Sequence, residues 1–211
     1  MKTYKLIILD FDGTIGDTNK VITQTMQDTL RALALPEVTP EACRKTIGLP
    51  LVEGFKTVLP LSDEQARQCA TLYHGLFEEN KGKSPVPVFP GVIDAIRRWH
   101  QQGAIITIAS SRGHRSLEAF VREMNLKAYI TYVLGAEDVE RAKPDPCPVI
   151  KTLEHFNIGA DDTLVVGDMT YDILMGKRAG CHTCGVTYGN GTREELAEAG
   201  AEMIVDTLDN L

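Results

Sequence analysis

The chain has 211 residues, of which 43% are hydrophobic and 24% are charged, and this composition is ordinary for a soluble globular protein. Its length suits one α/β domain or a core with an insertion, and leaves enough residues for a sizeable buried core. The net charge of −7 gives no broad attraction to nucleic acid or to an anionic membrane, so we expect neither as a partner. Any phosphate that the protein binds therefore needs local cations or a metal ion.

Nothing in the sequence indicates export or membrane insertion. The apolar run before Asp10 has only four residues after Lys5, which is too few for a secretory signal, and no apolar run approaches the length of a transmembrane helix. The five cysteines are odd in number and scattered, so they do not form a disulfide framework, and we expect a reduced, cytoplasmic protein. Cys181 and Cys184 match C-x-x-C, but on an expected strand they face opposite sides, which favours packing over a metal or redox site.

Apolar, strand-like runs recur along the chain, with helical patterns between most of them. These runs cover residues 4–9, 104–109, 132–134, 163–166, 184–186 and 203–205. Strands that alternate with helices predict an α/β fold with a doubly wound parallel sheet. Ligands of such sheets bind at the carboxyl ends of the strands, so the residues that directly follow each run are the first candidates for a site.

The alternation stops between residue 18 and about residue 83, where the sequence predicts helices only. A first amphipathic helix is expected over 19–35, a short second one begins at Thr39-Pro40, and a capping box at Ser62 opens a third that reaches about residue 79. The Gly- and Pro-rich residues 81–91 read as the return linker. We therefore predict a core domain of residues 1–16 and 87–211 and a helical cap domain of residues 17–86. This insertion either covers the site as a lid or only stabilises the core.

The first strand runs directly into Asp10-Phe11-Asp12-Gly13-Thr14. Residues i and i+2 of a strand point the same way, so Asp10 and Asp12 share a site. Gly13 allows a sharp turn that brings backbone N–H groups toward an anion, and Thr14 adds a hydroxyl. The four fixed positions of D-x-D-G-T match by chance at about one position in 10⁵. The bland alternative is an ordinary Asp-Gly turn after a buried strand.

Polar residues also follow three later segments. Ser110 and Ser111 come after the second strand and Ser110 can donate to a phosphoryl oxygen, while Arg112 either reaches a substrate or caps a helix. Lys143 precedes Pro144, which favours an extended backbone there. Asp168 and Asp172 follow the fourth strand four residues apart, on one face of any helix that begins there. Acidic residues also suit the first turn of a helix, which is the alternative interpretation of this pair.

In this order the motifs resemble those of the haloacid dehalogenase-like (HAD) superfamily. The matching residues are Asp10-Phe11-Asp12-Gly13-Thr14, Ser110, Lys143 and Gly167-Asp168 with Asp172, and the resemblance extends over the whole chain. The segments around Asp17-Thr18, Ile47-Gly48-Leu49-Pro50-Leu51 and Phe89-Pro90-Gly91-Val92 look like the phosphoglycolate phosphatase-type subgroup. Sugar-phosphate phosphatases, pyrophosphatases and a phosphomutase share similar segments. The resemblance implies a Rossmann-like core with an inserted helical cap.

The resemblance also implies roles for these residues. Asp10 would attack phosphorus to form an aspartyl-phosphate, and Asp12 would protonate the leaving oxygen and then take a proton from water. Mg²⁺ would be held by Asp10, the main-chain carbonyl of Asp12, and Asp168, with Asp172 as a further or occasional ligand. Transition-state charge would be stabilised by Lys143, Ser110, Gly13 and Thr14, with Ser111 and Arg112 as further substrate contacts.

The sequence therefore predicts a Mg²⁺-dependent phosphatase that acts on a small phosphate monoester, with phosphoglycolate as the first candidate. A pyrophosphatase or a β-phosphoglucomutase-like phosphotransferase is the nearest alternative. A receiver-like or non-catalytic phospho-ligand binding protein is an alternative of another class, although receivers lack the second aspartate and the helical insertion. Arg44 and Lys45 either meet a substrate carboxylate or second phosphate or are solvated, and His74, His100 and His155 are interpreted as structural. Neither the substrate nor the oligomeric state follows from the sequence.

Overall fold

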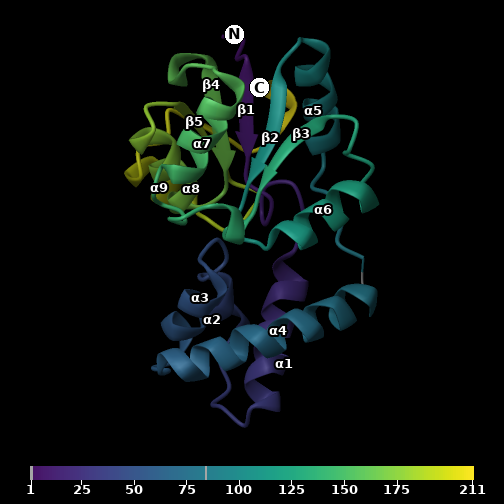
Figure 1. The fold of residues 1–211 in the computed structure, drawn as a ribbon, viewed down its shortest axis with the longest axis vertical. Coiled ribbons are helices and arrows are strands. Elements are labelled where there is room, and N and C mark those ends of the chain that lie inside the picture. Colours follow the sequence, from purple (N-terminus) through teal and green to yellow (C-terminus); the bar gives the residue numbers. More distant parts are fainter. Residues whose placement is uncertain (1, 84) are drawn as a thin grey trace.

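The computed structural model describes residues 2–83 and 85–211, and they form a parallel six-stranded sheet in the order β3-β2-β1-β4-β5-β6 (Figure 1). The strands are β1 (Leu6–Leu9), β2 (Ile105–Ala109), β3 (Ile130–Leu134), β4 (Thr163–Gly167), β5 (His182–Val186) and β6 (Met203–Val205). β1 lies between β2 and β4, and Leu9 is in register with Ile108 and Val166. The carboxyl ends of these three strands therefore meet at one edge of the sheet.

Helices cover both faces of the sheet, as the alternating residues of β1 require. Ile7 and Leu9 belong to a cluster that includes residues of α5 (Val92–Gln101) and α6 (His114–Glu123). Leu6 and Ile8 point the other way, into a cluster with α7 (Cys147–Phe156) and α8 (Thr170–Arg178). A last helix, α9 (Arg193–Glu198), packs near β5 and β6. The predicted doubly wound α/β architecture is confirmed.

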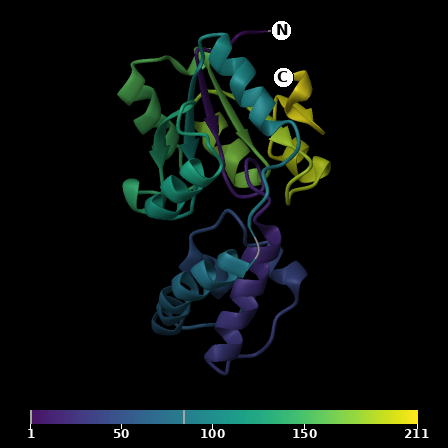
Figure 2. The same cartoon turned by 90° about the vertical axis from the view of Figure 1, so that its right-hand side faces the viewer.

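Four helices lie apart from the sheet, beyond the carboxyl ends of its strands (Figures 1 and 2). They are α1 (Asn19–Ala32), α2 (Pro40–Arg44), α3 (Leu51–Val58) and α4 (Asp63–Lys83). We call this group the helical region. The Thr39 hydroxyl accepts from the N–H of Ala42, and Ser62 and Gln65 exchange the two bonds of a capping box at 3.2 and 3.0 Å. These caps begin α2 and α4 where the sequence predicts them.

Three features of the helical region differ from those predicted. The first helix ends at Ala32, because Ala34 takes a positive φ of 51° and leaves the helical conformation. α3 is absent from the prediction, because its eight residues are too few for a clear helical period. α4 continues past residue 79 to Lys83, since Asn80 donates to Thr25 at 3.2 Å and Asp28 at 3.0 Å and so anchors the last turn on α1.

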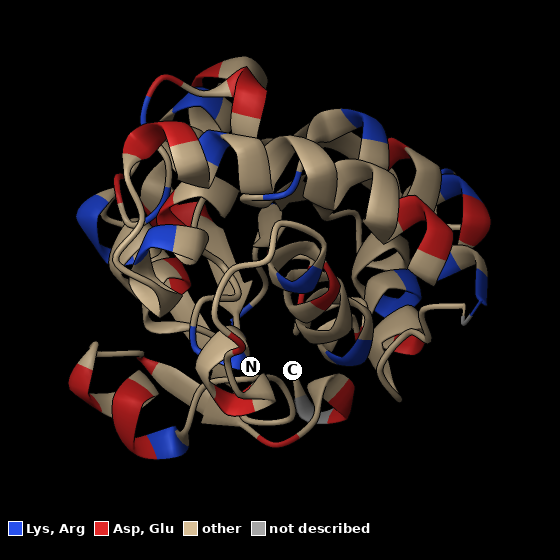
Figure 3. Ribbon diagram, turned by 90° about the horizontal axis from the view of Figure 1, so that it is seen from below, with Lys and Arg blue, Asp and Glu red and all other residues tan. Residues whose placement is uncertain are grey.

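Two neighbouring segments connect the helical region to the sheet (Figure 2). Gly16 pairs with Val88 in an antiparallel bridge, and the Asp17 N–H donates to the Pro87 carbonyl at 2.9 Å. The outgoing and returning chains are thus held side by side. In the view from below (Figure 3), ribbon segments with acidic residues and segments with basic residues are interspersed along the helices. Glu78 and Lys81 of α4, for example, form an ion pair at 3.4 Å.

All five cysteines are free. Cys184 lies in β5 and Cys181 directly before it, and burial raises the pKa of each thiol to about 12. Such thiols are packed and unreactive, in agreement with the packed-strand interpretation of the C-x-x-C match. Within the described parts of the chain, no helix is both long and apolar enough to cross a membrane.

Candidate active site

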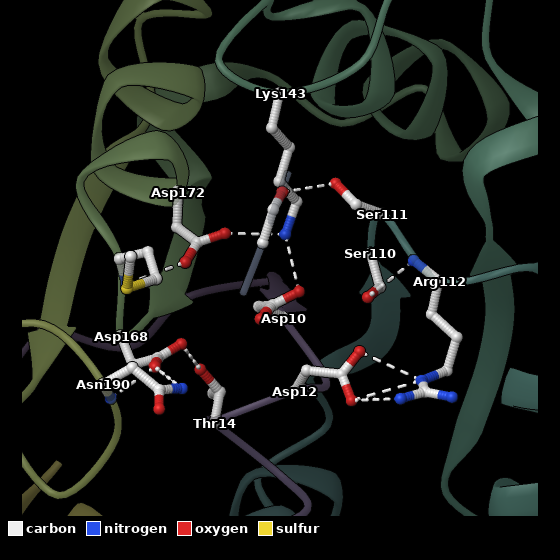
Figure 4. A network of polar contacts seen from close by, with 12 residues as sticks. Asp10, Asp12, Thr14, Ser110, Ser111, Arg112, Lys143, Asp168, Asp172 and Asn190 are labelled. Carbon is white, nitrogen blue, oxygen red and sulfur yellow. Dashed lines mark hydrogen bonds and ion pairs between the residues drawn. The ribbon is translucent and has the colours of Figure 1, made fainter. Parts of the chain in front are cut away.

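The predicted site residues converge where β1, β2 and β4 end (Figure 4). Asp10 follows β1, Ser110 follows β2 and Asp168 follows β4, and all three side chains are buried. The Asp10 N–H donates to the Val166 carbonyl at 2.9 Å, which continues the pairing of β1 with β4 past the last strand residue. The parallel register therefore delivers these side chains to one point.

Lys143 bridges two aspartates at this point. Its Nζ donates to Asp10 Oδ1 and to Asp172 Oδ1, both at 2.6 Å, and the three side chains are only 2–4% exposed. Burial alone lowers the pKa of Lys143, but the two carboxylates outweigh it and hold the pKa above its usual range. Lys143 therefore stays charged beside Asp10. Asp172 is fixed from behind, since its Oδ2 accepts from the Met169 N–H at 3.0 Å.

Three carboxylates around one lysine leave the cluster with an excess of negative charge. Asp10, Asp168 and Asp172 each offer an oxygen within 4.8 Å of the others. Burial, supported by Asp172 and Asp12 and opposed by Lys143, raises the pKa of Asp10 to about 7. Burial, together with repulsion from the carboxylates of Asp172 and Asp10, raises the pKa of Asp168 well above its usual range. Oxygen ligands and unbalanced negative charge are what Mg²⁺ requires, so these residues fit that ion.

Asp168 is held by residues for which the sequence predicts other roles or none. Asn190, in the loop after β5, donates to Asp168 Oδ2 from its N–H at 2.7 Å and from its side chain at 3.0 Å. The Thr14 hydroxyl, predicted to bind phosphate, is buried and donates to Asp168 Oδ1 at 3.3 Å. Asn190 was missed, and the one available signal is its position in Gly189-Asn190-Gly191 after a strand end.

Gly13 serves close packing at this site. Its φ is +92°, and a Cβ there would lie 2.1 Å from Asp168 Oδ2. Its N–H donates to the Gly16 carbonyl at 3.0 Å, so that group is used within the loop and not directed at an anion as predicted. Only glycine lets the β1 loop pass this near to Asp168.

Asp12 faces away from the carboxylate cluster and pairs with Arg112. Arg112 donates from Nη2 to Asp12 Oδ1 at 2.7 Å and from Nε to Oδ2 at 3.0 Å and to Oδ1 at 3.2 Å. Arg112 does not cap a helix, so that interpretation is wrong, and its main contact, Asp12, was not predicted. A contact of Arg112 with a substrate stays a prediction. The metal contact predicted for Asp12, through its main-chain carbonyl, stays a prediction. Ser111, predicted to contact substrate, instead donates from Oγ to the Gly48 carbonyl at 2.7 Å, across to the helical region.

A cavity of about 720 Å³ opens between the sheet and the helical region. The core contributes Asp10, Asp12, Ser110, Ser111 and Arg112 to its lining, and α1 and α4 contribute Ile22, Met26, Tyr73, His74 and Phe77. Arg44 is exposed on α2 and outside this lining, so the structure does not bring that predicted contact to the site. His74 borders the cavity, whereas His155 stacks on Tyr132 at 4.2 Å, as a structural histidine does.

Comparison with known proteins places this geometry in a family. A relative named probable phosphatase IndB, from Dickeya dadantii strain 3937, is 35% identical and the alignment covers 98% of this chain and 91% of that protein. A phosphoglycolate phosphatase of Vibrio cholerae is 27% identical over 100% of this chain and 96% of its own. The crystal structure of a predicted phosphatase from Clostridium acetobutylicum superposes with a TM-score of 0.90 at 25% identity and covers 99% of this chain and 96% of that one.

The family model described as haloacid dehalogenase-like hydrolase matches residues 7–186, which run from β1 through β5. This match includes Asp10, Ser110, Lys143 and Asp168, which the structure gathers at one edge of the sheet. The resemblance inferred from the motifs is thereby confirmed, and the chain belongs to the haloacid dehalogenase-like hydrolases.

Proposed function

We propose that this protein is a Mg²⁺-dependent phosphatase that hydrolyses a small phosphate monoester through an aspartyl-phosphate on Asp10. The observation that carries the proposal is the contact of the Asp10 carboxylate with Lys143 Nζ, 2.6 Å away, together with the position of Asp10 and Asp12 in the lining of one cavity. The family and the relatives named phosphatases support the same reaction class.

Asp10 is the nucleophile in this proposal because its carboxylate lines the cavity and lies 2.6 Å from the ammonium group of Lys143. Attack on phosphorus needs the ionised carboxylate, and the Lys143 ammonium favours that form against the effect of burial. Asp10, Asp168, Asp172 and the main-chain carbonyl of Asp12 would hold Mg²⁺. When bound, this ion supplies positive charge beside the nucleophile and the phosphoryl oxygens.

Asp12 supplies the proton transfers and Ser110 a hydroxyl. Asp12 is two residues from the nucleophile, lines the same cavity and is free of the Lys143 cluster. It would protonate the leaving oxygen in the first displacement and accept a proton from water in the second. Ser110 Oγ accepts from the Arg112 N–H at 3.3 Å, which leaves its own proton to donate to a phosphoryl oxygen.

Phosphoglycolate remains the first substrate to test, and the cavity broadens the panel. A volume of about 720 Å³ is within the range of pockets that hold drug-sized ligands, so it admits leaving groups larger than glycolate. Apolar side chains from α1 and α4 line the far side, opposite the carboxylates. Sugar phosphates, nucleotides and pyrophosphate therefore belong beside phosphoglycolate. A phosphotransferase would use the same residues but keep water from the aspartyl-phosphate.

The test is release of inorganic phosphate from this panel and from p-nitrophenyl phosphate, with Mg²⁺ and with a chelator. We expect sustained, metal-dependent release with one preferred substrate. Sustained release from the panel argues against a mutase. No release from any ester, with or without Mg²⁺, would refute the phosphatase proposal and favour a phosphotransferase or a binding protein.

A further inference from the structure

The Arg112–Asp12 pair is nearly removed from water. The Arg112 side chain is 8% exposed and that of Asp12 10%, and three hydrogen bonds join them at 2.7 to 3.2 Å. A guanidinium that binds both oxygens of a carboxylate fixes its orientation as well as its distance. Arg112 therefore determines where the Asp12 oxygens point in the cavity.

Arg112 is held in turn by aromatic rings from two parts of the molecule. Its guanidinium carbon lies 4.4 Å from the ring centre of Phe77, 5.3 Å from that of Phe120 and 6.0 Å from that of Phe11. Phe120 lies on α6 and Phe11 follows β1, whereas Phe77 lies on α4 of the helical region. The nearest of the three rings thus comes from outside the core, and cations over aromatic faces are attracted to them.

The position of Phe77 is coupled to the placement of α4 against α6. Phe77 stacks on Tyr73 at 5.8 Å and meets Phe120 edge-on at 6.4 Å. One turn further along α4, Lys81 Nζ lies 3.1 Å from Glu123 of α6 and 4.8 Å from the ring of Phe120. A shift of α4 away from α6 would break these contacts and remove Phe77 from Arg112.

We propose that Arg112 is a positioning residue for Asp12, and that α4 of the helical region supports it through Phe77. The inference depends on the proposed function, in which Asp12 acts in both displacements. In the second, a water oxygen bonds to phosphorus, the bond from phosphorus to the Asp10 oxygen breaks with its electron pair returning to Asp10, and a proton passes from water to Asp12. Because Arg112 binds both oxygens of Asp12, it fixes the direction from which Asp12 can accept this proton.

The inference predicts a specific kinetic defect in Arg112→Ala. The enzyme is used in excess over p-nitrophenyl phosphate. Release of nitrophenolate measures the rate at which the aspartyl-phosphate forms, and acid quenching with a phosphate assay measures the rate at which it decays. Nitrophenolate leaves without help from an acid, so formation should change by less than about 3-fold, while decay should slow by about 100-fold, as for loss of a positioned base. Arg112→Lys keeps the charge without the fork and should recover part of the decay rate.

Phe77→Leu tests the contribution of the helical region. Leucine keeps an apolar side chain but has no aromatic face, so decay should slow by about 3- to 10-fold with formation unchanged. Phe55→Leu is the matched control, because Phe55 is a buried ring of α3 that packs on Tyr73 and is not among the rings that face Arg112. We expect its decay rate to equal that of the wild type, and a melting curve of each variant shows whether it is folded.

The outcomes separate the inference from the proposed function. Equal slowing of formation and decay in Arg112→Ala, or in Arg112→Lys if the alanine variant does not fold, would show a general structural effect and overturn the positioning role. Phe77→Leu behaviour identical to Phe55→Leu would overturn the support from α4. Wild-type enzyme that forms no aspartyl-phosphate would refute the proposed function, and this inference with it.

Discussion

The molecule contains two buried charge groups at its cavity, and they differ in balance and in support. The Lys143 group joins Asp10 and Asp172, with Asp168 within reach, and every one of these residues belongs to the core. The Arg112–Asp12 pair has one charge of each sign and rests on Phe77 of the helical region. The shortest ion-pair distances are nearly equal, 2.6 Å and 2.7 Å. The two groups differ in two ways. The Lys143 group has an excess of negative charge, and the Arg112–Asp12 pair lies where the core meets the helical region.

This difference divides the proposed chemistry between two parts of the fold. The unbalanced group suits a divalent cation, which offsets its negative charge and can then attract a phosphate. The balanced pair needs no further ion, and its geometry depends on where the helical region lies. In the proposed mechanism, phosphoryl binding is a property of the core, whereas Asp12, the proton-transfer group, is positioned where the core meets the helical region.

Asp10→Asn should remove the nucleophile and lower phosphate release by at least about 10⁴-fold, since an amide does not replace a carboxylate in attack on phosphorus. Folding should be unharmed, because the variant removes one carboxylate from a group with an excess of them. The matched variant Asp12→Asn should also lose turnover, yet still form an aspartyl-phosphate with p-nitrophenyl phosphate. Full turnover by Asp10→Asn would show that the two groups do not divide the reaction in this way.

Lys143→Met should destabilise the protein by about 3–5 kcal/mol, because it leaves buried carboxylates without their cation. At about 2–4 °C per kcal/mol, the melting temperature should fall by roughly 6–20 °C. The matched control is Lys5→Met, since the Lys5–Asp162 pair at 2.8 Å has side chains 70% and 42% exposed and should contribute little. Equal melting temperatures for the two variants would mean that Lys143 does not stabilise the folded protein by offsetting the buried carboxylates.

The excess charge also predicts how metal-free stability changes with pH. Asp10 has a folded-state pKa of about 7 against an ordinary 3.8, so the folded protein binds more protons than the unfolded chain between these values. Stability of the metal-free protein should therefore fall as the pH rises from about 4 to about 7. The raised pKa of Asp168 acts in the same direction.

Mg²⁺ should reverse that loss. At 100 times its dissociation constant a ligand of the folded state adds about 2.7 kcal/mol, or roughly 5–10 °C for a chain of this size. We expect this increase at pH 8 and much less at pH 5, where protons compete for the carboxylates. Thermal melting with chelator and with Mg²⁺ at both pH values measures it, and Asp168→Asn should abolish it. An increase of equal size at both pH values would contradict the assignment of the ion to this cluster.

The two buried charge groups also differ in how far the sequence could predict them. Asp10, Ser110 and Asp168 are predictable, because each follows an apolar strand and parallel strands bring their carboxyl ends to one edge. The placement of Lys143 beside Asp10 comes from the resemblance to the family, because Lys143 directly follows no predicted strand. Each of these inferences needs only the strand period and the order of motifs.

The remaining contacts depend on how separate elements pack, which strand periods do not contain. The pairing of Arg112 with Asp12 joins residues 100 positions apart in the chain, and the bond from Thr14 to Asp168 joins residues 154 positions apart. Asn190 becomes meaningful only when β5 is known to lie beside β4. Arg44 has a suitable charge, but the short α2 leaves it exposed.

Ser111→Ala should produce the smallest effect. It tests how much the contact between the core and the helical region at Gly48 contributes to stability and substrate binding. The variant loses the hydrogen bond from Ser111 Oγ to the Gly48 carbonyl, a net contribution of about 1 kcal/mol, so the melting temperature should fall by no more than about 4 °C. If this bond helps to hold the helical region over the cavity, KM should rise about 2- to 5-fold with kcat within about 2-fold, because substrate binding and not proton transfer is affected. Ser111→Thr keeps the hydroxyl and should restore the KM in steady-state assays. A fall in kcat as large as that of Arg112→Ala would mean that Asp12 is held through the Gly48 contact as much as through Phe77, and that the contacts between the core and the helical region act as one unit.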